Sequence, residues 1–191
     1  GKPRCGGEWG GALGTDSIVF YVASAHPPNA TGFVDMLAPP GCVPPGSKIV
    51  VGGRVGELIQ ATPQYHFARR LFEETTTFIF QQPDADIAAI TGLAKGIILP
   101  ITSGGGSNLK TAEALLTLKP VVATSRSFRG FEDFVGLSGV YIADDPTQFK
   151  RYVRDLLCGG LESSRVAADV EALLWENTLS RLPPAVKSLF R

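Results

Sequence analysis

Short apolar segments that alternate with helical segments are the feature that most constrains the fold of this chain. The segment 18–23 (IVFYVA) is a continuous run of apolar residues, rich in β-branched and aromatic side chains. Such a run is typical of a strand buried on both faces. Shorter runs of the same kind follow at 48–51 (KIVV), 78–80, 96–100 (GIILP), 120–123 (PVVA) and 140–143. The pattern predicts an α/β fold, namely a Rossmann-like, doubly wound parallel sheet with helices on both faces.

Helical segments are expected between these strands. In chain order they cover 30–38, 55–60, 84–93, 109–118, 146–157 and an amphipathic stretch within 166–190. We expect Asn29 or Thr31 to cap the first of them, and a looser segment around His66. Sheets of this kind bind ligands at the carboxyl ends of their strands, near the point where the strand order reverses.

The sequence is organised as one domain with an appendage at each end. Residues 1–16 are rich in glycine and show no periodicity, so we expect a linker or a severed connection there. The regular pattern begins at residue 17 and continues to about residue 182. Residues 183–191, which begin with two consecutive prolines, are expected to form a C-terminal tail or helix.

Charge and composition exclude several classes of partner. Eighteen basic and eighteen acidic residues cancel, and no run of like charge stands out. Neither a nucleic acid nor an anionic membrane is therefore expected as the main partner. No apolar stretch approaches the length of a transmembrane helix. The three cysteines are widely spaced, which favours a reduced, cytoplasmic compartment, and we expect no bound metal and no cofactor.

The segment 99–116 (LPITSGGGSNLKTAEALL) carries the densest functional signal. It joins a buried strand to a helix through the loop residues Gly104, Gly105, Gly106, Ser107 and Asn108. Glycines allow backbone N–H groups to approach an anion closely, and the helix N-terminus adds unpaired donors. Lys110 supplies a mobile positive charge for a phosphate, and Glu113 lies almost one turn further, where it can accept hydrogen bonds from ribose hydroxyls. The alternative is a tight turn followed by a solvated Lys–Glu pair.

Two familiar phosphate-binding loops are excluded. The stretch 104–111 nearly matches the P-loop pattern, but Leu109 stands where its second glycine is required. The first turn between a strand and a helix, SAHPPN at 24–29, lacks the G-x-G-x-x-G motif. The sequence therefore indicates neither a P-loop ATPase nor a standard NAD enzyme.

The segment 100–133 (PITSGGGSNLKTAEALLTLKPVVATSRSFRGFED) resembles the donor-binding signature of retaining glycosyltransferases with the GT-B fold, the group-one superfamily. Other elements of the C-terminal, donor-binding half are matched in order by IVFYVASAHPPNATGF, KIVVGG, GVYIADDPTQFKRYVRDLL and LLWENTLSRL. The resemblance covers residue 17 to about residue 182. It implies that the chain is one half of a GT-B enzyme, in which an N-terminal acceptor-binding domain, absent from this sequence, forms the other half.

The activity implied by the resemblance is transfer of a sugar from a nucleotide diphosphate sugar to an acceptor hydroxyl, with retention, in polysaccharide biosynthesis. The enzyme is expected in the cytoplasm, with any membrane association provided by the other half. An isolated donor-binding half is expected to be inactive.

The resemblance also implies roles for individual positions. Glu113 matches the glutamate that binds the donor ribose, and the loop 104–108 with Lys110 matches the part of the site beside the pyrophosphate and the donor sugar. Further candidates for the donor site are His26, Arg54, Arg126 and Arg129. Gly105 stands where many relatives carry a glutamate that faces the donor sugar, and their usual pyrophosphate clamp is not evident. No catalytic residue is assigned.

Three interpretations stay open from the sequence. The chain is the donor-binding half of an active transferase, or a catalytically degenerate nucleotide- or phosphate-binding module with a regulatory or assembly role. The third is an unrelated doubly wound domain. The first interpretation is the one that the resemblance implies, whereas the absent glutamate and clamp are what a module of the second kind would show. None of the three specifies the base, the sugar or the acceptor.

Overall fold

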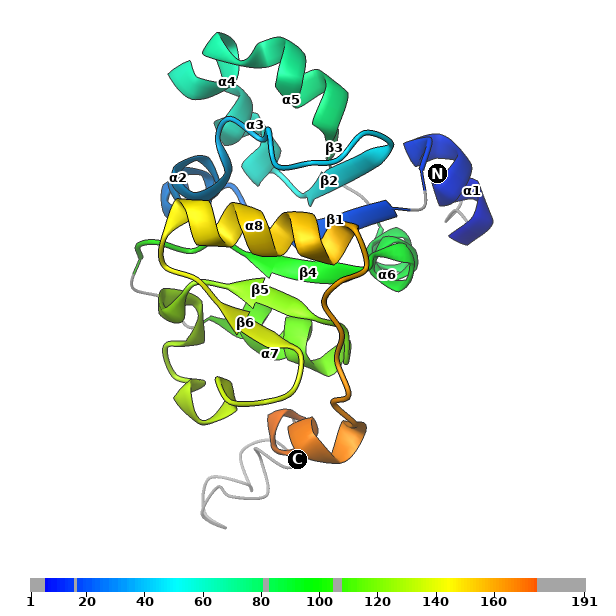
Figure 1. Ribbon diagram of the computed structural model, residues 1–191, viewed down its shortest axis with the longest axis vertical. Helices are drawn as coiled ribbons and strands as arrows, with labels where there is room; N and C mark the ends of the chain where they lie inside the picture. Colours follow the sequence, from blue (N-terminus) through cyan, green and yellow to red (C-terminus); the bar gives the residue numbers. More distant parts are fainter. Residues whose placement is uncertain (1–5, 16, 81–82, 105–107, 175–191) are drawn as a thin grey trace, which may run out of the picture.

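Six parallel strands form the centre of the molecule. The computed structural model describes residues 6–15, 17–80, 83–104 and 108–174. The strands pair in the order β3-β2-β1-β4-β5-β6 (Figure 1). Their bounds are Ser17–Val22 (β1), Ser47–Gly52 (β2), Thr76–Ile79 (β3), Gly96–Leu99 (β4), Val121–Ala123 (β5) and Val140–Ile142 (β6). The predicted fold class is confirmed, and each predicted strand is present within two residues of its expected bounds.

Helices cover both faces of this sheet. On one face lie α2 (Pro27–Leu37), α3 (Val55–Gln60), α4 (Pro63–Phe67), α5 (Arg69–Thr75) and α8 (Pro146–Leu157). On the other face lie α1 (Gly6–Leu13), α6 (Asp84–Leu93) and α7 (Leu109–Leu116), together with the 3₁₀ helices η1 (Ser125–Phe128) and η3 (Ala167–Leu173). A third 3₁₀ helix, η2 (Glu132–Phe134), follows η1. In Figure 1, α8 crosses in front of the sheet and α7 lies behind it.

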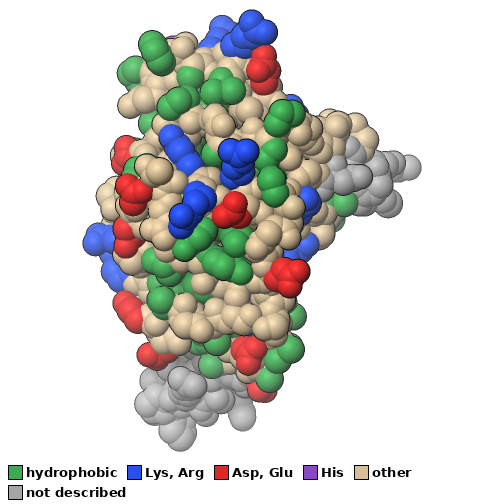
Figure 2. All heavy atoms as spheres, viewed as in Figure 1, with side chains coloured by type: hydrophobic (Ala, Val, Ile, Leu, Met, Phe, Trp, Pro, Cys, Tyr) green, Lys and Arg blue, Asp and Glu red, His purple; other side chains and the backbone are tan. Residues whose placement is uncertain are grey.

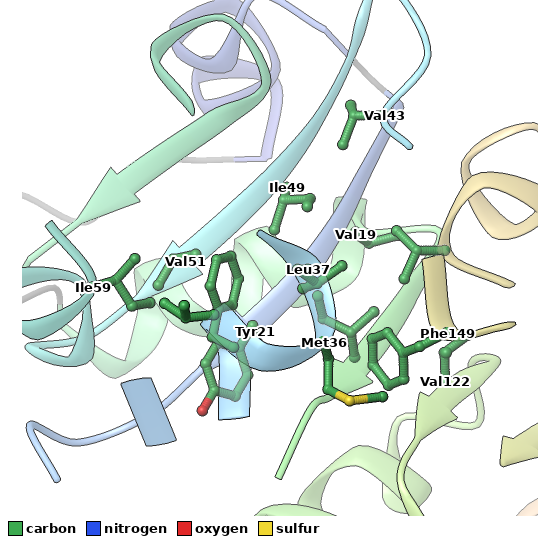
Figure 3. Packing of buried hydrophobic residues seen from close by; sticks show 14 of the residues in the cluster. Val19, Tyr21, Met36, Leu37, Val43, Ile49, Val51, Ile59, Val122 and Phe149 are labelled. Atoms are coloured by element: carbon green, nitrogen blue, oxygen red, sulfur yellow. The ribbon is translucent and has the colours of Figure 1, made fainter. Parts of the chain in front are cut away.

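The alternation of side chains along β1 explains why this strand is apolar throughout. Val19 and Tyr21 belong to the hydrophobic cluster beneath α2 and α8, whereas Ile18 and Phe20 belong to the cluster beneath α6 and α7. Successive side chains of a strand point to opposite faces, so a strand covered on both faces needs apolar residues at every position. Figure 3 shows part of the first cluster, where side chains from β1, β2, α2 and α8 pack together.

Helix α8 illustrates the amphipathic pattern of the covering layer. Phe149, Val153 and Leu156 are buried against the sheet. Lys and Arg side chains gather over the outer face of this helix (Figure 2). Asp145 caps it by accepting a hydrogen bond from the backbone N–H of Gln148 at 2.9 Å, and a proline follows in the first turn.

The N-terminal segment departs from its prediction. Residues 6–13 form α1, so the expectation that no folded element precedes residue 17 is wrong for this stretch. Trp9 and Leu13 are buried, and the indole N–H of Trp9 donates to the Asp86 carboxylate at 3.2 Å. The glycines that surround Trp9 conceal the helix in the sequence, because a glycine-rich segment has weak local helix propensity.

Three further local predictions are wrong. Helix α2 begins at Pro27 and not after Asn29, because proline needs no N–H partner in the first turn. The looser segment around His66 is in fact the helices α4 and α5, and Thr62 caps α4 by accepting from the Tyr65 N–H at 3.2 Å. Within the predicted C-terminal helix, Ala167–Leu173 form the 3₁₀ helix η3 instead, and the residues from 175 onward lie outside the described residues.

Within the residues that the structure describes, no helix combines the length and the apolar character that crossing a membrane would require.

Candidate functional site

The carboxyl ends of the strands meet at one edge of the sheet, because all six strands are parallel. From β1 the chain proceeds to β2 and β3 on one side, and from β4 it proceeds to β5 and β6 on the other. The strand order therefore reverses between β1 and β4 (Figure 1). At such a point the loops that follow the two strands separate and leave a crevice for a ligand. Here those loops are 23–26, before α2, and 100–108, before α7.

Helix α2 lies directly against the loop that follows β4. A Cβ atom placed on Gly32 would lie 2.0 Å from the carbonyl oxygen of Pro100, and one placed on Gly104 would lie 3.4 Å from Pro28. The Thr102 hydroxyl also donates to the Asp35 carboxylate of α2 at 3.2 Å. These contacts, from the first turn to the last, hold α2 beside the loop 100–104.

Lys110 connects α7 to α2 across this junction. Its ammonium donates to the side-chain oxygen of Asn29 at 2.8 Å, and the lysine is half-buried. Burial lowers the pKa of Lys110, whereas the nearby carboxylate of Glu113 raises that pKa. The two residues therefore interact electrostatically, as their spacing on one helix predicts. Glu113 itself is exposed.

Two arginines converge on the carbonyl oxygen of Gly104. Arg126 Nη2 and Arg129 Nη1 each donate to it at 2.9 Å. Arg126 lies within η1 and Arg129 directly follows it, so both are positioned by the turn after β5. Asn108 completes the connection, because its side-chain amide donates to the carbonyl oxygen of Arg126 at 2.9 Å. The arrangement places two guanidinium groups beside the loop between β4 and α7.

Three buried hydroxyl residues that the sequence did not single out support this cluster. Ser127 donates to the carbonyl oxygen of Leu99 at 2.7 Å, and Thr111 of α7 donates to the carbonyl oxygen of Ser127. Thr124 donates to the carbonyl oxygen of Ile101. The bonds join β4, the loop after it, α7 and η1 through backbone carbonyl oxygens. Their only signal in the sequence is a small hydroxyl residue directly after a strand or in the first turn of a helix.

The architecture of the chain is shared by glycosyltransferases of known structure. AviGT4, a glycosyltransferase involved in avilamycin A biosynthesis, matches with a TM-score of 0.54 and 18% identity, covering 84% of this chain and 46% of AviGT4. Alr3699/HepE of Anabaena, solved with UDP and glucose, matches with a TM-score of 0.58 and 18% identity, covering 95% of this chain and 53% of that protein. Its complex with UDP-glucose matches with a TM-score of 0.54.

The fold is that of one half of a GT-B glycosyltransferase. The chain spans about half the length of the structures that it matches. No protein-family model matches the sequence, and no curated protein matches it. The fold implied by the sequence resemblance is therefore confirmed by structure alone.

The donor-site residues that the sequence predicts fall into three groups. Hydrogen bonds bring together Gly104, Asn108, Arg126 and Arg129, and Lys110 lies two residues beyond Asn108, where it contacts α2. Gly105, Gly106 and Ser107 lie outside the described residues. Glu113, His26 and Arg54 are exposed at other points of the same edge.

Arg54 and His26 contribute less to the cluster than the other candidates. Arg54 follows β2 and forms an exposed ion pair with Glu57 at 3.1 Å, which raises the pKa of Arg54. His26 precedes α2 and makes no side-chain capping bond to it. Among the described residues, no group of three or more His, Cys, Asp or Glu side chains is arranged to hold a metal ion.

Proposed function

We propose that this GT-B half-domain binds a nucleotide diphosphate sugar at the carboxyl edge of its sheet, as the donor-binding half of a glycosyltransferase. One observation carries the proposal. Arg126 and Arg129 both donate to the carbonyl oxygen of Gly104, in the loop between β4 and α7. Directly after this loop, in the first turn of α7, Lys110 donates to Asn29 of α2, so that these cations lie where the strand order reverses. A diphosphate carries negative charge that such a cluster, together with the N-terminus of α7, would stabilise.

The reaction that this site would serve is sugar transfer to an acceptor hydroxyl, with retention at the sugar carbon, in the synthesis of a polysaccharide or related glycan. The half-domain would act electrostatically. Its cations would stabilise the diphosphate leaving group as negative charge develops on it. A second, N-terminal half would bind the acceptor and close the cleft. Because Alr3699/HepE was solved with UDP and with UDP-glucose, UDP is the first nucleotide to test.

The role of Glu113 distinguishes this donor site from a general phosphate site. Calorimetric titration with UDP, GDP, dTDP and ADP should show binding of one nucleotide in preference to the others. Glu113→Gln removes the charge at nearly constant shape and should weaken that binding about tenfold, since hydrogen bonds to a charged group contribute about 1.5–3 kcal/mol. The matched control is Glu162→Gln, because Glu162 is an exposed glutamate that lies with Lys95 and Pro120, at the amino ends of β4 and β5.

The control variant should bind with unchanged affinity. Equal affinities of Glu113→Gln and the wild-type protein would refute the ribose role of Glu113. Absence of binding by all four nucleotides to the folded protein would refute the donor-site proposal itself.

A catalytically degenerate nucleotide-binding module is the second candidate. The observation that favours it is the ion pair between Arg54 and Glu57, which engages the arginine that follows β2. Such a module would bind the nucleotide as described above. However, when joined to an N-terminal half, it would not cleave the bond between the sugar and the nucleoside diphosphate, either by hydrolysis or by transfer to an acceptor.

A further inference from the structure

Asn29 is a buried polar residue in the first turn of α2, and only 6% of its surface is exposed. Both ends of its side-chain amide are engaged. The nitrogen donates to the carbonyl oxygen of Ser24 at 3.0 Å, and the oxygen accepts from the Lys110 ammonium at 2.8 Å. A carbonyl oxygen only accepts hydrogen bonds, so the bond to Ser24 determines that the amide oxygen is the end that faces Lys110.

The backbone of Asn29 is held as well. Tyr21, a completely buried residue of β1, donates its hydroxyl to the carbonyl oxygen of Asn29 at 3.1 Å. Burial also raises the pKa of Tyr21, so the hydroxyl keeps its proton and stays a donor. In addition to its contact with Lys110, Asn29 is thus held by β1 and by the loop after β1. This is the geometry of a rigid support and not of an incidental surface contact.

The contact has two consequences for Lys110. A lysine side chain loses about 2 kcal/mol of conformational entropy when it is immobilised, and a bond that orders it in the free protein removes part of that cost from ligand binding. In addition, Asn29 is neutral, so it orients the ammonium without cancelling its charge as a carboxylate would. An ammonium has three N–H donors, and Asn29 accepts a hydrogen bond from one of them, so Asn29 leaves the other two for further acceptors.

We propose that Asn29 is a positioning residue, which holds the Lys110 ammonium at the switch point of the sheet so that it contacts the phosphates of a nucleoside diphosphate. The inference rests on the proposed function and extends it to a residue of the loop and helix after β1. Asn29 belongs neither to the sequence motif around Gly104 nor to the turn after β5 that carries the two arginines.

A double-mutant cycle tests the coupling between the two residues. Affinity for the preferred nucleoside diphosphate is measured by calorimetry for the wild-type protein, Asn29→Ala, Lys110→Ala and the double variant. Asn29→Ala should weaken binding about fivefold to tenfold, since the loss is that of one charge-assisted hydrogen bond. In the Lys110→Ala background the same change should alter affinity less than twofold, because the group that Asn29 positions is already absent.

Two further variants separate positioning from structural support. Asn29→Asp keeps the shape of the side chain but pairs the ammonium with a carboxylate, so it should weaken diphosphate binding even where Lys110 stays ordered. In case Asn29→Ala does not fold, the same cycle is run with Asn29→Ser, which stays neutral and so adds no direct repulsion of the phosphates. Ser17→Ala removes a hydrogen bond from the Ser17 hydroxyl to the carbonyl oxygen of Leu157, at the amino end of β1 and so at the opposite edge of the sheet. It should lower thermal stability and leave the affinity within twofold of wild type.

The outcomes are distinct. Equal losses from the Asn29 substitutions in the presence and absence of Lys110 would overturn the positioning role, while binding by the wild-type protein would leave the proposed function standing. If the wild-type protein binds none of the nucleotides, the proposed function and this inference fail together.

Discussion

Glycines shape the candidate site as much as its charged side chains do. Gly32 allows α2 to pass the carbonyl oxygen of Pro100, where a Cβ would lie at 2.0 Å. Gly53, which follows β2 with a φ of +89°, would place a Cβ 2.4 Å from the carbonyl oxygen of Ala23. In both cases the obstructing atom belongs to the backbone, so it cannot move aside as the end of a flexible side chain can.

Gly32→Ala should therefore destabilise the protein by about 3 kcal/mol, since the added methyl group separates α2 from the loop after β4. The matched control is Gly92→Ala in α6, where no atom lies within 4 Å of the added Cβ. At this exposed helical position the change should stabilise by about 0.5–1 kcal/mol. Unfolding in guanidinium chloride measures both. Similar midpoints for the two variants would contradict the close approach of α2 to Pro100.

Among the secondary-structure elements, α1 is the one whose packing against the domain the sequence pattern does not indicate. It packs against α6 through Trp9, which is 5% exposed, and Asp86, which is 4% exposed. The indole N–H and the carboxylate are joined by a hydrogen bond at 3.2 Å. A buried carboxylate requires such donors, because its desolvation is otherwise costly. The helix therefore belongs to the core of the domain and not to a linker.

Trp9→Ala should destabilise the protein by about 3–4 kcal/mol, as expected for removal of a large buried aromatic side chain. Phe67→Ala in α4 is the control, because this phenylalanine is 93% exposed and its removal should change stability by less than about 0.5 kcal/mol. Thermal unfolding followed by circular dichroism distinguishes the two. If α1 were a free linker, both variants would unfold at the wild-type temperature.

For the molecule as a whole, the strand order predicts which segments a bound ligand should protect from hydrogen exchange. Hydrogen exchange measured with and without the preferred nucleotide should slow in 23–29, 100–104 and 124–130, the segments that meet at the carboxyl edge. Segment 159–165 contributes to the opposite edge, beside Lys95 and Pro120, and should exchange at an unchanged rate. Protection of that segment alone would place the ligand at the amino ends of the strands and contradict the proposed site.

The fold class and the position of the central loop follow from the sequence alone. Runs such as 18–23 are apolar throughout. A strand with this pattern has to be buried on both faces, which indicates a parallel sheet covered by helices on both sides. The junction of strand, glycines and helix at 99–116 is equally local, so the sequence pattern is sufficient to select Gly104 and Lys110 as candidates.

Only the tertiary structure decides which distant residues meet at this loop. Asn29 and Lys110 are separated by 81 positions in the sequence, and they come together because β1 and β4 are neighbours in the sheet. Arg126 and Arg129 reach Gly104 for a similar reason, since β5 lies beside β4. Trp9 and Asp86 are 77 positions apart. Strand order depends on long-range packing and not on local propensity, so no pattern within one segment could have revealed these contacts.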